Sequence, residues 1–167
     1  MSVAFRRESD EEHLEPKFEL PIPAGPNLVT SRGLALIGER VAALETALKD
    51  QPDEATRTAL VRDLRYWKAR HVSAELTAPA SGDKVEFGTV VTIRLNGRDR
   101  TFRIVGDDEA DPAAGLLSFT APLSRAMMGG EVGEVLPFAG REDAIEIVAI
   151  EPIAQDQEVP AKSPLAK

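Results

Sequence analysis

Apolar side chains recur at alternating intervals of three and four residues in two neighbouring stretches of the chain. The first series follows the potential helix caps Thr30 and Ser31 and consists of Leu34, Ile37, Val41, Leu44 and Leu48. The second series consists of Leu60, Leu64, Trp67, His71 and Ala74. Such spacing lines one face of an α-helix with apolar groups and is the repeat of a coiled-coil seam. Because Pro52 interrupts the helical pattern, residues 28–76 are predicted to form an antiparallel helical hairpin.

A different pattern begins beyond residues 77–82, a segment of small residues and Pro that is predicted to be a linker. From residue 83 to residue 152, apolar and polar positions alternate as they do in β-strands. Asn96-Gly97 separates two alternating runs and predicts a two-residue hairpin turn, since both residues tolerate positive φ. The predicted core consists of Val85, Phe87, Val90, Ile93, Leu95, Phe102, Ile104, Leu117, Phe119, Val135, Leu136, Phe138, Ile145, Ile147, Val148 and Ile150. The predicted fold class is α+β, a helical hairpin followed by a small antiparallel β domain.

The most specific stretch of the sequence lies inside this second domain. Its predicted elements are a strand over 101–105, a loop rich in Gly, Asp and Pro over 106–115, a strand over 116–120, a short helix over 124–128 and a strand over 135–138. Pro122 can open the helix because its fixed φ suits the first helical turn. Gly129 and Gly130 can end it because glycine adopts the positive φ that helix ends often require.

This order of elements, with its residues, resembles the C-terminal domain of the Gre-type transcription elongation factors, GreA and GreB. The resemblance is carried by Ile104-Val105-Gly106-Asp107-Asp108-Glu109-Ala110-Asp111, by Ser118, by Pro122-Leu123-Ser124-Arg125-Ala126-Met127-Met128 and by Glu131-Val132-Gly133-Glu134. Ala121 stands where the family usually has Ser, and Ser124 stands where it has Ala or Gly. The resemblance covers residues 83–152 and implies an FKBP-like fold with the short helix on one face of the sheet.

The resemblance also implies a partner. Gre factors bind RNA polymerase through this domain and insert their helical hairpin into the secondary channel, where acidic residues at the hairpin tip help to hold a catalytic magnesium. Carried over to this chain, the partner-binding residues are Ser118, Thr120, Pro122, Leu123, Arg125, Asp107 and Glu109. Thr120 replaces a residue that is often acidic in the family. The resemblance favours a monomer.

The hairpin tip departs from the family pattern, which places an acidic pair in an Asp/Glu-Asn-Ala sequence at the end of a longer hairpin. This chain offers Asp50, Asp53 and Glu54 as candidates to assist a polymerase-bound magnesium, in a hairpin that reaches only about 30 Å at about 1.5 Å per helical residue. Asp53 and Glu54 have an alternative role, because acidic residues stabilise a helix N-terminus. Two hypotheses therefore stay open. One is a Gre-like polymerase-binding regulator without cleavage stimulation; the other is an Rnk-like regulator, of the nucleoside diphosphate kinase regulator type, or a protein-interaction module.

Composition limits the chemistry that the chain can perform. It has no Cys and two separated His, so disulfides, thiolate metal sites and a histidine metal cluster are excluded. There is no phosphate-binding loop or nucleophile–base pair, and the β domain lacks the Trp or Tyr that would line a prolyl isomerase pocket. We therefore expect no enzyme activity, no catalytic residues and no cofactor of its own. A net charge of -8 disfavours strong independent nucleic-acid binding and favours a protein partner with a basic surface.

Several stretches are predicted to face solvent. Residues 1–27 combine a charged run with Pro and are expected to be a disordered arm, with a short recognition segment as the alternative, and residues 153–167 are expected to be a disordered tail. The acidic turn over 107–111 lacks the ligand spacing of a calcium loop and is expected to be solvated or to face a basic partner. A solvated basic face is expected on the second helix, at Arg57, Arg62, Arg65, Lys68 and Arg70, with Trp67 and His71 packed in the seam.

No apolar run approaches the about 20 residues of a membrane-spanning helix. Residues 1–7 lack the basic-then-apolar order of a signal peptide. A cytoplasmic location, away from membranes, is therefore expected.

Overall fold

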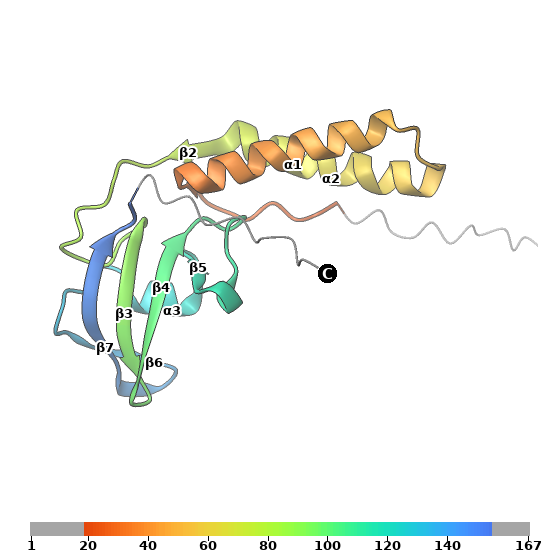
Figure 1. Ribbon diagram of the computed structural model, residues 1–167. Coiled ribbons are helices and arrows are strands. Elements are labelled where there is room, and N and C mark those ends of the chain that lie inside the picture. The colour runs from red at the N-terminus through yellow and green to blue at the C-terminus, as the bar shows by residue number, and fades with distance from the viewer. Residues whose placement is uncertain (1–18, 155–167) are drawn as a thin grey trace, which may run out of the picture.

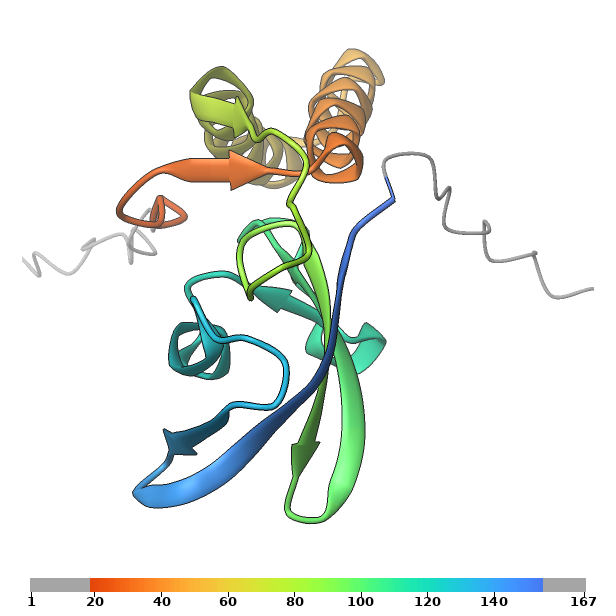
Figure 2. The ribbon, with the colours of Figure 1, turned by 90° about the vertical axis from the view of Figure 1, so that its left-hand side faces the viewer.

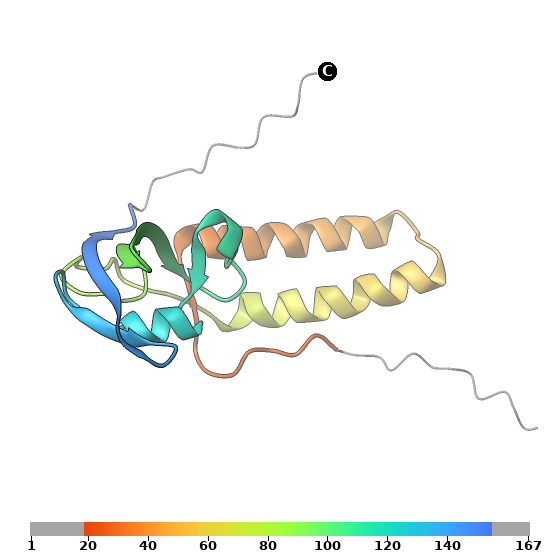
Figure 3. The ribbon, with the colours of Figure 1, turned by 90° about the horizontal axis from the view of Figure 1, so that it is seen from below.

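The computed structural model describes residues 19–154, in which a two-helix hairpin lies over one end of a small β domain (Figure 1). The expected arm over 1–18 and the expected tail over 155–167 lie outside the described residues. Helix α1 (Ser31–Lys49) and helix α2 (Glu54–Ser73) run side by side and project past the β domain (Figure 3). The predicted α+β class is confirmed. In the described part of the chain, no helix is long and apolar enough to cross a membrane.

The two helices begin at side-chain caps that satisfy otherwise unpaired backbone N–H groups. The Thr30 hydroxyl accepts from the Gly33 N–H at 3.0 Å, and the Asp53 carboxylate accepts from the Thr56 N–H at 3.4 Å. Between the helices, Gln51 adopts a φ of 51°, which turns the chain. Ile37 is fully buried in the seam. The predicted cap at Thr30 is therefore confirmed.

Charged and aromatic side chains on the two helices contact one another beside the seam. The Arg40 guanidinium lies 5.8 Å from the centroid of the Trp67 ring, and Lys68 and Glu45 form an ion pair at 2.9 Å. His71 lies across from Gly38 of α1, but it is exposed and not buried as predicted, and its neighbour Arg70 is the buried residue. The β domain approaches this end of α2 and buries a face that the seam pattern does not include.

A short parallel pair of strands ties the two ends of the hairpin together. Strand β1 (Asn27–Val29) pairs with strand β2 (Ala74–Leu76) in parallel, with Asn27 opposite Ala74. The sequence pattern predicts that Asn27 belongs to a disordered arm and residues 74–76 to the helical hairpin. Both assignments are corrected here, since Asn27 is buried and residues 74–76 are extended. Three residues are too few for an alternating pattern to be visible.

The β domain is a five-stranded sheet with the order β5-β4-β3-β7-β6. Its strands are β3 (Thr89–Leu95), β4 (Arg98–Val105), β5 (Leu116–Ser118), β6 (Val135–Phe138) and β7 (Arg141–Pro152). A short 3-10 helix, η1 (Pro112–Ala114), precedes β5, and helix α3 (Pro122–Met127) follows it and lies against one face of the curved sheet (Figure 2). Asn96 and Gly97 have φ values of 51° and 74° between β3 and β4, which confirms the predicted hairpin turn.

The sheet is not wholly antiparallel as predicted, because β5 pairs with β4 in parallel, with Ile104 opposite Leu117. Two parallel strands need a crossing connection, and the acidic loop together with η1 supplies it. This arrangement brings the loop after β4 to the end of the sheet that faces the hairpin (Figure 1).

The core lies between the sheet and α3. Its buried members are Val85, Val91, Ile93, Ile104, Leu117, Met127, Ile145 and Ile147. Three predicted core positions are corrected, since Val90 and Val148 are half-buried and lie outside the core cluster and Val135 is 51% exposed. Phe87 lies in a loop before β3, so the alternation begins at Thr89 and buries Val91 in place of Val90.

Candidate functional site

The acidic loop, which we define as Asp107, Asp108 and Glu109, directly follows β4 and lies where the base of the hairpin meets the β domain. The predicted solvated turn is wrong for two of its residues, because the side chains of Asp108 and Glu109 are only 6% and 4% exposed. Buried carboxylates need hydrogen-bonding or charged partners. Each of the three residues has a separate set of partners, and two of these sets belong to the hairpin.

Asp108 holds helix α2. Its carboxylate accepts from the Arg70 Nε at 2.5 Å and from the Tyr66 hydroxyl at 2.5 Å. The Arg70 side chain is 2% exposed, and its Nη2 also donates to the Asn27 Oδ1 at 2.6 Å. Asn27 in turn donates from its Nδ2 to the Arg70 carbonyl at 2.8 Å. The prediction that Arg70 belongs to a solvated basic face is therefore wrong.

The pKa of Tyr66 reflects its burial beside Asp108. Burial, together with the neighbouring Asp108 carboxylate, raises the pKa of Tyr66 to about 12. The neutral phenol donates to the carboxylate, whereas a phenolate would repel it. Tyr66 therefore stays protonated and keeps its hydrogen bond to Asp108 throughout the neutral range.

Glu109 holds the start of helix α1. The Thr30 hydroxyl donates to the Glu109 Oε2 at 2.6 Å, and the Arg32 Nη1 donates to the Oε1 at 3.0 Å. A carboxylate is favoured at this position because the N-terminus of a helix carries a partial positive charge. Glycine is favoured at position 33, because a Cβ there would lie 2.8 Å from the Glu109 Oε2 and would displace the carboxylate from Thr30.

Asp107 organises the edge of the β domain that contains the predicted partner-binding residues. Its Oδ1 accepts from the Ser118 hydroxyl and from the Thr120 hydroxyl, the latter at 2.7 Å. The Ser118 hydroxyl also accepts from the Thr120 N–H at 3.1 Å, which fixes the backbone before α3. The Asp107 Oδ2 lies 3.9 Å from the Arg70 Nη2, so the same carboxylate faces the hairpin.

The other predicted partner-binding residues follow this edge directly. Pro122 and Arg125 are exposed on α3, whereas Leu123 is half-buried and packs against the core. The structure therefore brings Asp107, Ser118 and Thr120 together beside the start of α3. Glu109 lies on the hairpin side of the loop. Arg70 and Asn27 are not among the predicted site residues, because their role depends on contacts between distant segments.

The acidic residues of the hairpin tip are not part of this site. Asp50 and Asp53 cap the facing ends of α1 and α2, and Glu54 lies in the first turn of α2, at the end of the hairpin remote from the β domain (Figure 1). Hydrogen bonds from Thr56 lower the pKa of Asp53, as expected of a helix cap. Among residues 19–154, no group of three or more His, Asp or Glu could hold a metal ion.

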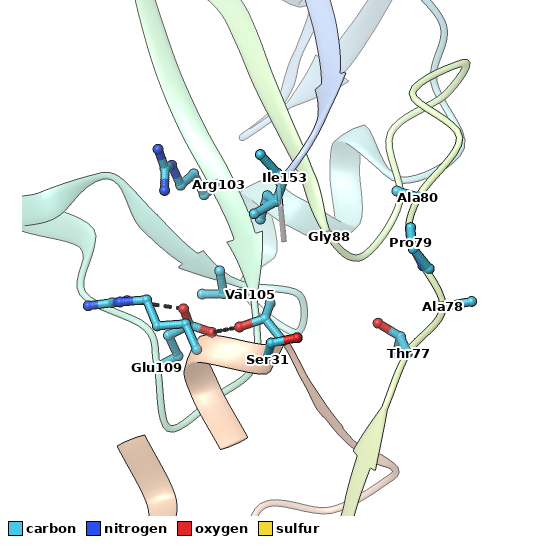
Figure 4. A pocket seen from close by; sticks show the side chains of 13 residues that line it. Ser31, Thr77, Ala78, Pro79, Ala80, Gly88, Arg103, Val105, Glu109 and Ile153 are labelled. Atoms are coloured by element: carbon cyan, nitrogen blue, oxygen red, sulfur yellow. Dashed lines mark hydrogen bonds and ion pairs between the residues drawn. The ribbon is translucent and has the colours of Figure 1, made fainter. Parts of the chain in front are cut away.

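A small cavity of about 70 Å³ separates the hairpin base from the sheet (Figure 4). It is lined by Arg32, Thr77, Gly88, Val105 and Ile153, among others. Small-molecule sites usually enclose about 300–1,000 Å³, so this space does not fit a substrate pocket. The site is therefore best described as a polar junction between two structural units and an adjoining exposed edge.

The fold and the site define a class of protein in which a helical hairpin is joined through polar contacts to a small β domain. Residues 79–152 match the family described as transcription elongation factor, GreA/GreB, C-term. These residues are therefore similar to the C-terminal domain of GreA and GreB, and the resemblance predicted from the sequence is confirmed.

Individual relatives are similar to this chain over a comparable number of residues. The transcription elongation factor GreA of Rhizobium etli (strain CIAT 652) is 36% identical over 94 residues, which are 54% of this chain and 59% of the relative. The GreA of Caulobacter vibrioides (strain NA1000 / CB15N) is 43% identical over 75 residues, which are 42% of this chain and 48% of the relative. The chain thus spans about half the length of these relatives.

Among solved structures, GreA factor homolog 1 (Gfh1) of Thermus thermophilus aligns at 18% identity with a TM-score of 0.36, over 76% of this chain and 99% of that chain.

Proposed function

We propose that this protein is a Gre-type regulator of transcription elongation that docks on RNA polymerase through its β domain. The observation that carries the proposal is the similarity of residues 79–152 to the GreA/GreB C-terminal domain, together with the edge at Ser118 and Thr120 that is held in place by Asp107. The exposed Pro122 follows that edge. A pre-formed edge favours binding because little conformational freedom is lost on association.

The proposal includes two finer structural points. The five-stranded sheet with α3 against one face is proposed to be an FKBP-like fold that presents the Pro122 edge to the polymerase. The two helices are proposed to form a short coiled coil directed at the secondary channel. Support for the coiled coil comes from the buried Ile37 and from the pairing of Arg40 with Trp67 across the helices.

The hairpin is proposed to act without stimulating transcript cleavage. Helices of 19 and 20 residues span about 30 Å at about 1.5 Å per residue. The Asp53 carboxylate at the tip is already used as the cap of α2. Such a hairpin would act by occupying the channel, in competition with a factor whose tip does hold magnesium.

A binding experiment tests the docking proposal. Pro122→Asn is expected to weaken binding to core RNA polymerase at least tenfold while the circular dichroism spectrum stays native. Pro137→Asn is the matched control, since Pro137 is an exposed proline of the same domain on strand β6. Binding by the Pro122→Asn variant that equals wild type and Pro137→Asn would contradict the proposal.

A second candidate function is that of an Rnk-like regulator, of the nucleoside diphosphate kinase regulator type, whose partner is not an elongating polymerase. The short hairpin favours it. Backtracked elongation complexes distinguish the candidates when the protein is added alone and then against a true Gre factor. Inhibition of the true factor without cleavage supports the first proposal, cleavage by the protein alone contradicts the absence of stimulation, and no effect in either assay supports the second candidate.

A further inference from the structure

We infer that Arg70 is a positioning residue that, through the acidic loop, sets the direction in which the hairpin points from the β domain. This inference concerns the free protein and goes beyond the proposed function, so it stands or falls without any polymerase. Figure 1 shows the arrangement to be explained, in which the hairpin extends across the end of the sheet and well past it.

The acidic loop binds the hairpin at two separate points. Asp108 binds α2 through Arg70 and Tyr66, whereas Glu109 binds the first residues of α1 through Thr30 and Arg32. A single contact would allow the hairpin to rotate about it. Two contacts on two different helices, made by adjacent residues of one loop, define an orientation.

The chain segment that connects the hairpin to the β domain does not fix the angle between them. The chain passes from the hairpin to the β domain once among the described residues, through the segment between β2 and β3. In its first part, residues 77–84, there is no helix or strand, and Ala78, Pro79 and Ser81 are exposed; the β-domain core begins further along the segment, at the buried Val85. A connection of this kind fixes how far apart the two units can move, but it does not fix their angle.

The charged side chains that join the hairpin to the β domain are buried. The side chains of Arg70 and Asp108 are 2% and 6% exposed, and neither belongs to the core of the β domain. A buried charge that loses its partner is strongly unfavourable unless water can reach it. Rotation of the hairpin away from the sheet would admit water without disturbing the core. Loss of one partner is therefore expected to change the hairpin direction before it unfolds the β domain.

Asp107 relates the direction of the hairpin to the exposed edge of the β domain. Asp107 accepts from Ser118 and Thr120 with one oxygen, and its other oxygen faces Arg70. Asp107 is also the neighbour of Asp108 in the chain. The direction of the hairpin is thus defined relative to the edge that precedes Pro122.

A distance measurement in the full chain tests the inference. Because the chain contains no Cys, a single pair of spin labels can be placed by Gln51→Cys at the exposed hairpin tip and Glu142→Cys at the exposed start of β7. The otherwise unchanged protein is expected to give one narrow distance population by pulsed electron paramagnetic resonance. Arg70→Met is expected to lose that population and give a broader or displaced one.

Two further variants make the result specific. Asp108→Asn weakens the same contact from the other domain and is expected to have the same effect, so the inference stays testable should Arg70→Met fail to fold. Arg65→Met is the matched control, because Arg65 lies on the same helix, is 64% exposed and forms an ion pair with the exposed Glu19. It is expected to keep the narrow population.

Amide spectra of the β-domain core complete the test. Native core signals together with an altered distance in Arg70→Met and Asp108→Asn support positioning by Arg70. A narrow, unshifted population in both variants, or an equal change in Arg65→Met, would overturn it.

Discussion

At the domain junction, both carboxylate oxygens of Asp108 and of Glu109 accept hydrogen bonds, whereas one residue of the β domain provides a contrast. Ser124, on the buried side of α3, is 0% exposed, and its hydroxyl has no hydrogen-bond partner. An unsatisfied buried hydroxyl is unfavourable because it gives up its bonds to water. The position therefore carries an avoidable cost to stability.

Replacing this hydroxyl is expected to stabilise the protein. Ser124→Ala should raise the free energy of unfolding by about 1 kcal/mol, the lower end of the usual cost of an unsatisfied buried polar group. Urea denaturation measures the change. Ser118→Ala is the control, since the Ser118 hydroxyl is bonded to Asp107 and its loss should destabilise the protein. A decrease in stability for Ser124→Ala would show that its hydroxyl has a partner.

Two helical glycines of α1 are expected to respond in opposite ways to the same substitution. Gly33→Ala would place a Cβ 2.8 Å from the Glu109 Oε2, so it should destabilise the protein by about 1–3 kcal/mol through overpacking. Gly38→Ala would place a Cβ 4.0 Å from the His71 Nε2, an ordinary contact, and should stabilise the helix by about 0.5–1 kcal/mol. Thermal denaturation of the two variants measures both changes, and equal effects would contradict the close approach of Glu109.

Tyr66 is the only tyrosine in the chain, so its ionisation can be followed directly by ultraviolet absorbance. Its pKa of about 12 in the folded protein lies above the value of about 10 for an unfolded chain. The folded protein therefore binds this proton more tightly. The stabilisation that results from this tighter proton binding is fully present below a pH of about 10. It is lost as the pH rises towards the pKa of Tyr66 in the folded protein. A folded-state absorbance midpoint near pH 10 would contradict the burial of Tyr66 beside Asp108.

At the scale of elements, the start of α1 combines two functions in one side chain. The Thr30 hydroxyl caps the helix through Gly33 and also donates to Glu109. Thr30→Ala should therefore destabilise the protein by about 2 kcal/mol, the upper end of the range for a lost helix cap. Thr30→Ser keeps the hydroxyl and is expected to retain most of the stability in urea denaturation. Equal losses for the two variants would mean that the methyl group, not the hydroxyl, is what matters.

The elements predicted from the sequence are those whose cause is local. The seam of α1, its cap at Thr30 and the turn at Asn96-Gly97 follow from residue spacing and backbone preference. The strands β1 and β2 were missed because each has three residues and is stabilised by its partner across the hairpin. The burial of Arg70 was missed for the same kind of reason, since the β domain covers that face of α2.

The candidate site likewise has one part that could be predicted from the sequence and one part that could not. The edge at Ser118, Thr120 and Pro122 could be located in the sequence because the GreA/GreB resemblance covers it. The partners of Asp108 and Glu109 lie 38 to 79 residues away in the sequence, and no spacing rule connects them. An acidic run in a loop has the same composition whether it is solvated or buried. Only the packing of the hairpin against the sheet decides between these two states.

At the scale of the whole molecule, the junction should make the two structural units unfold together. Trp67, the only tryptophan, lies on α2 and reports on the hairpin by fluorescence, whereas amide signals of Ile93 and Ile147 report on the core of the β domain. In the wild-type protein both signals are expected to be lost at the same urea concentration, because separating the units would break the buried ion pair between Arg70 and Asp108. A cooperative transition of this kind is the usual behaviour of one folding unit.

Asp108→Asn should separate these two transitions. The variant weakens the contact with Arg70 while the core of the β domain is unchanged, so Trp67 fluorescence is expected to change at lower urea than the amide signals of the core. Arg65→Met, which removes an exposed charge from the same helix, should leave the transitions coincident. If the transitions already differ in the wild-type protein, the hairpin and the β domain are energetically independent, and the buried junction does not couple them.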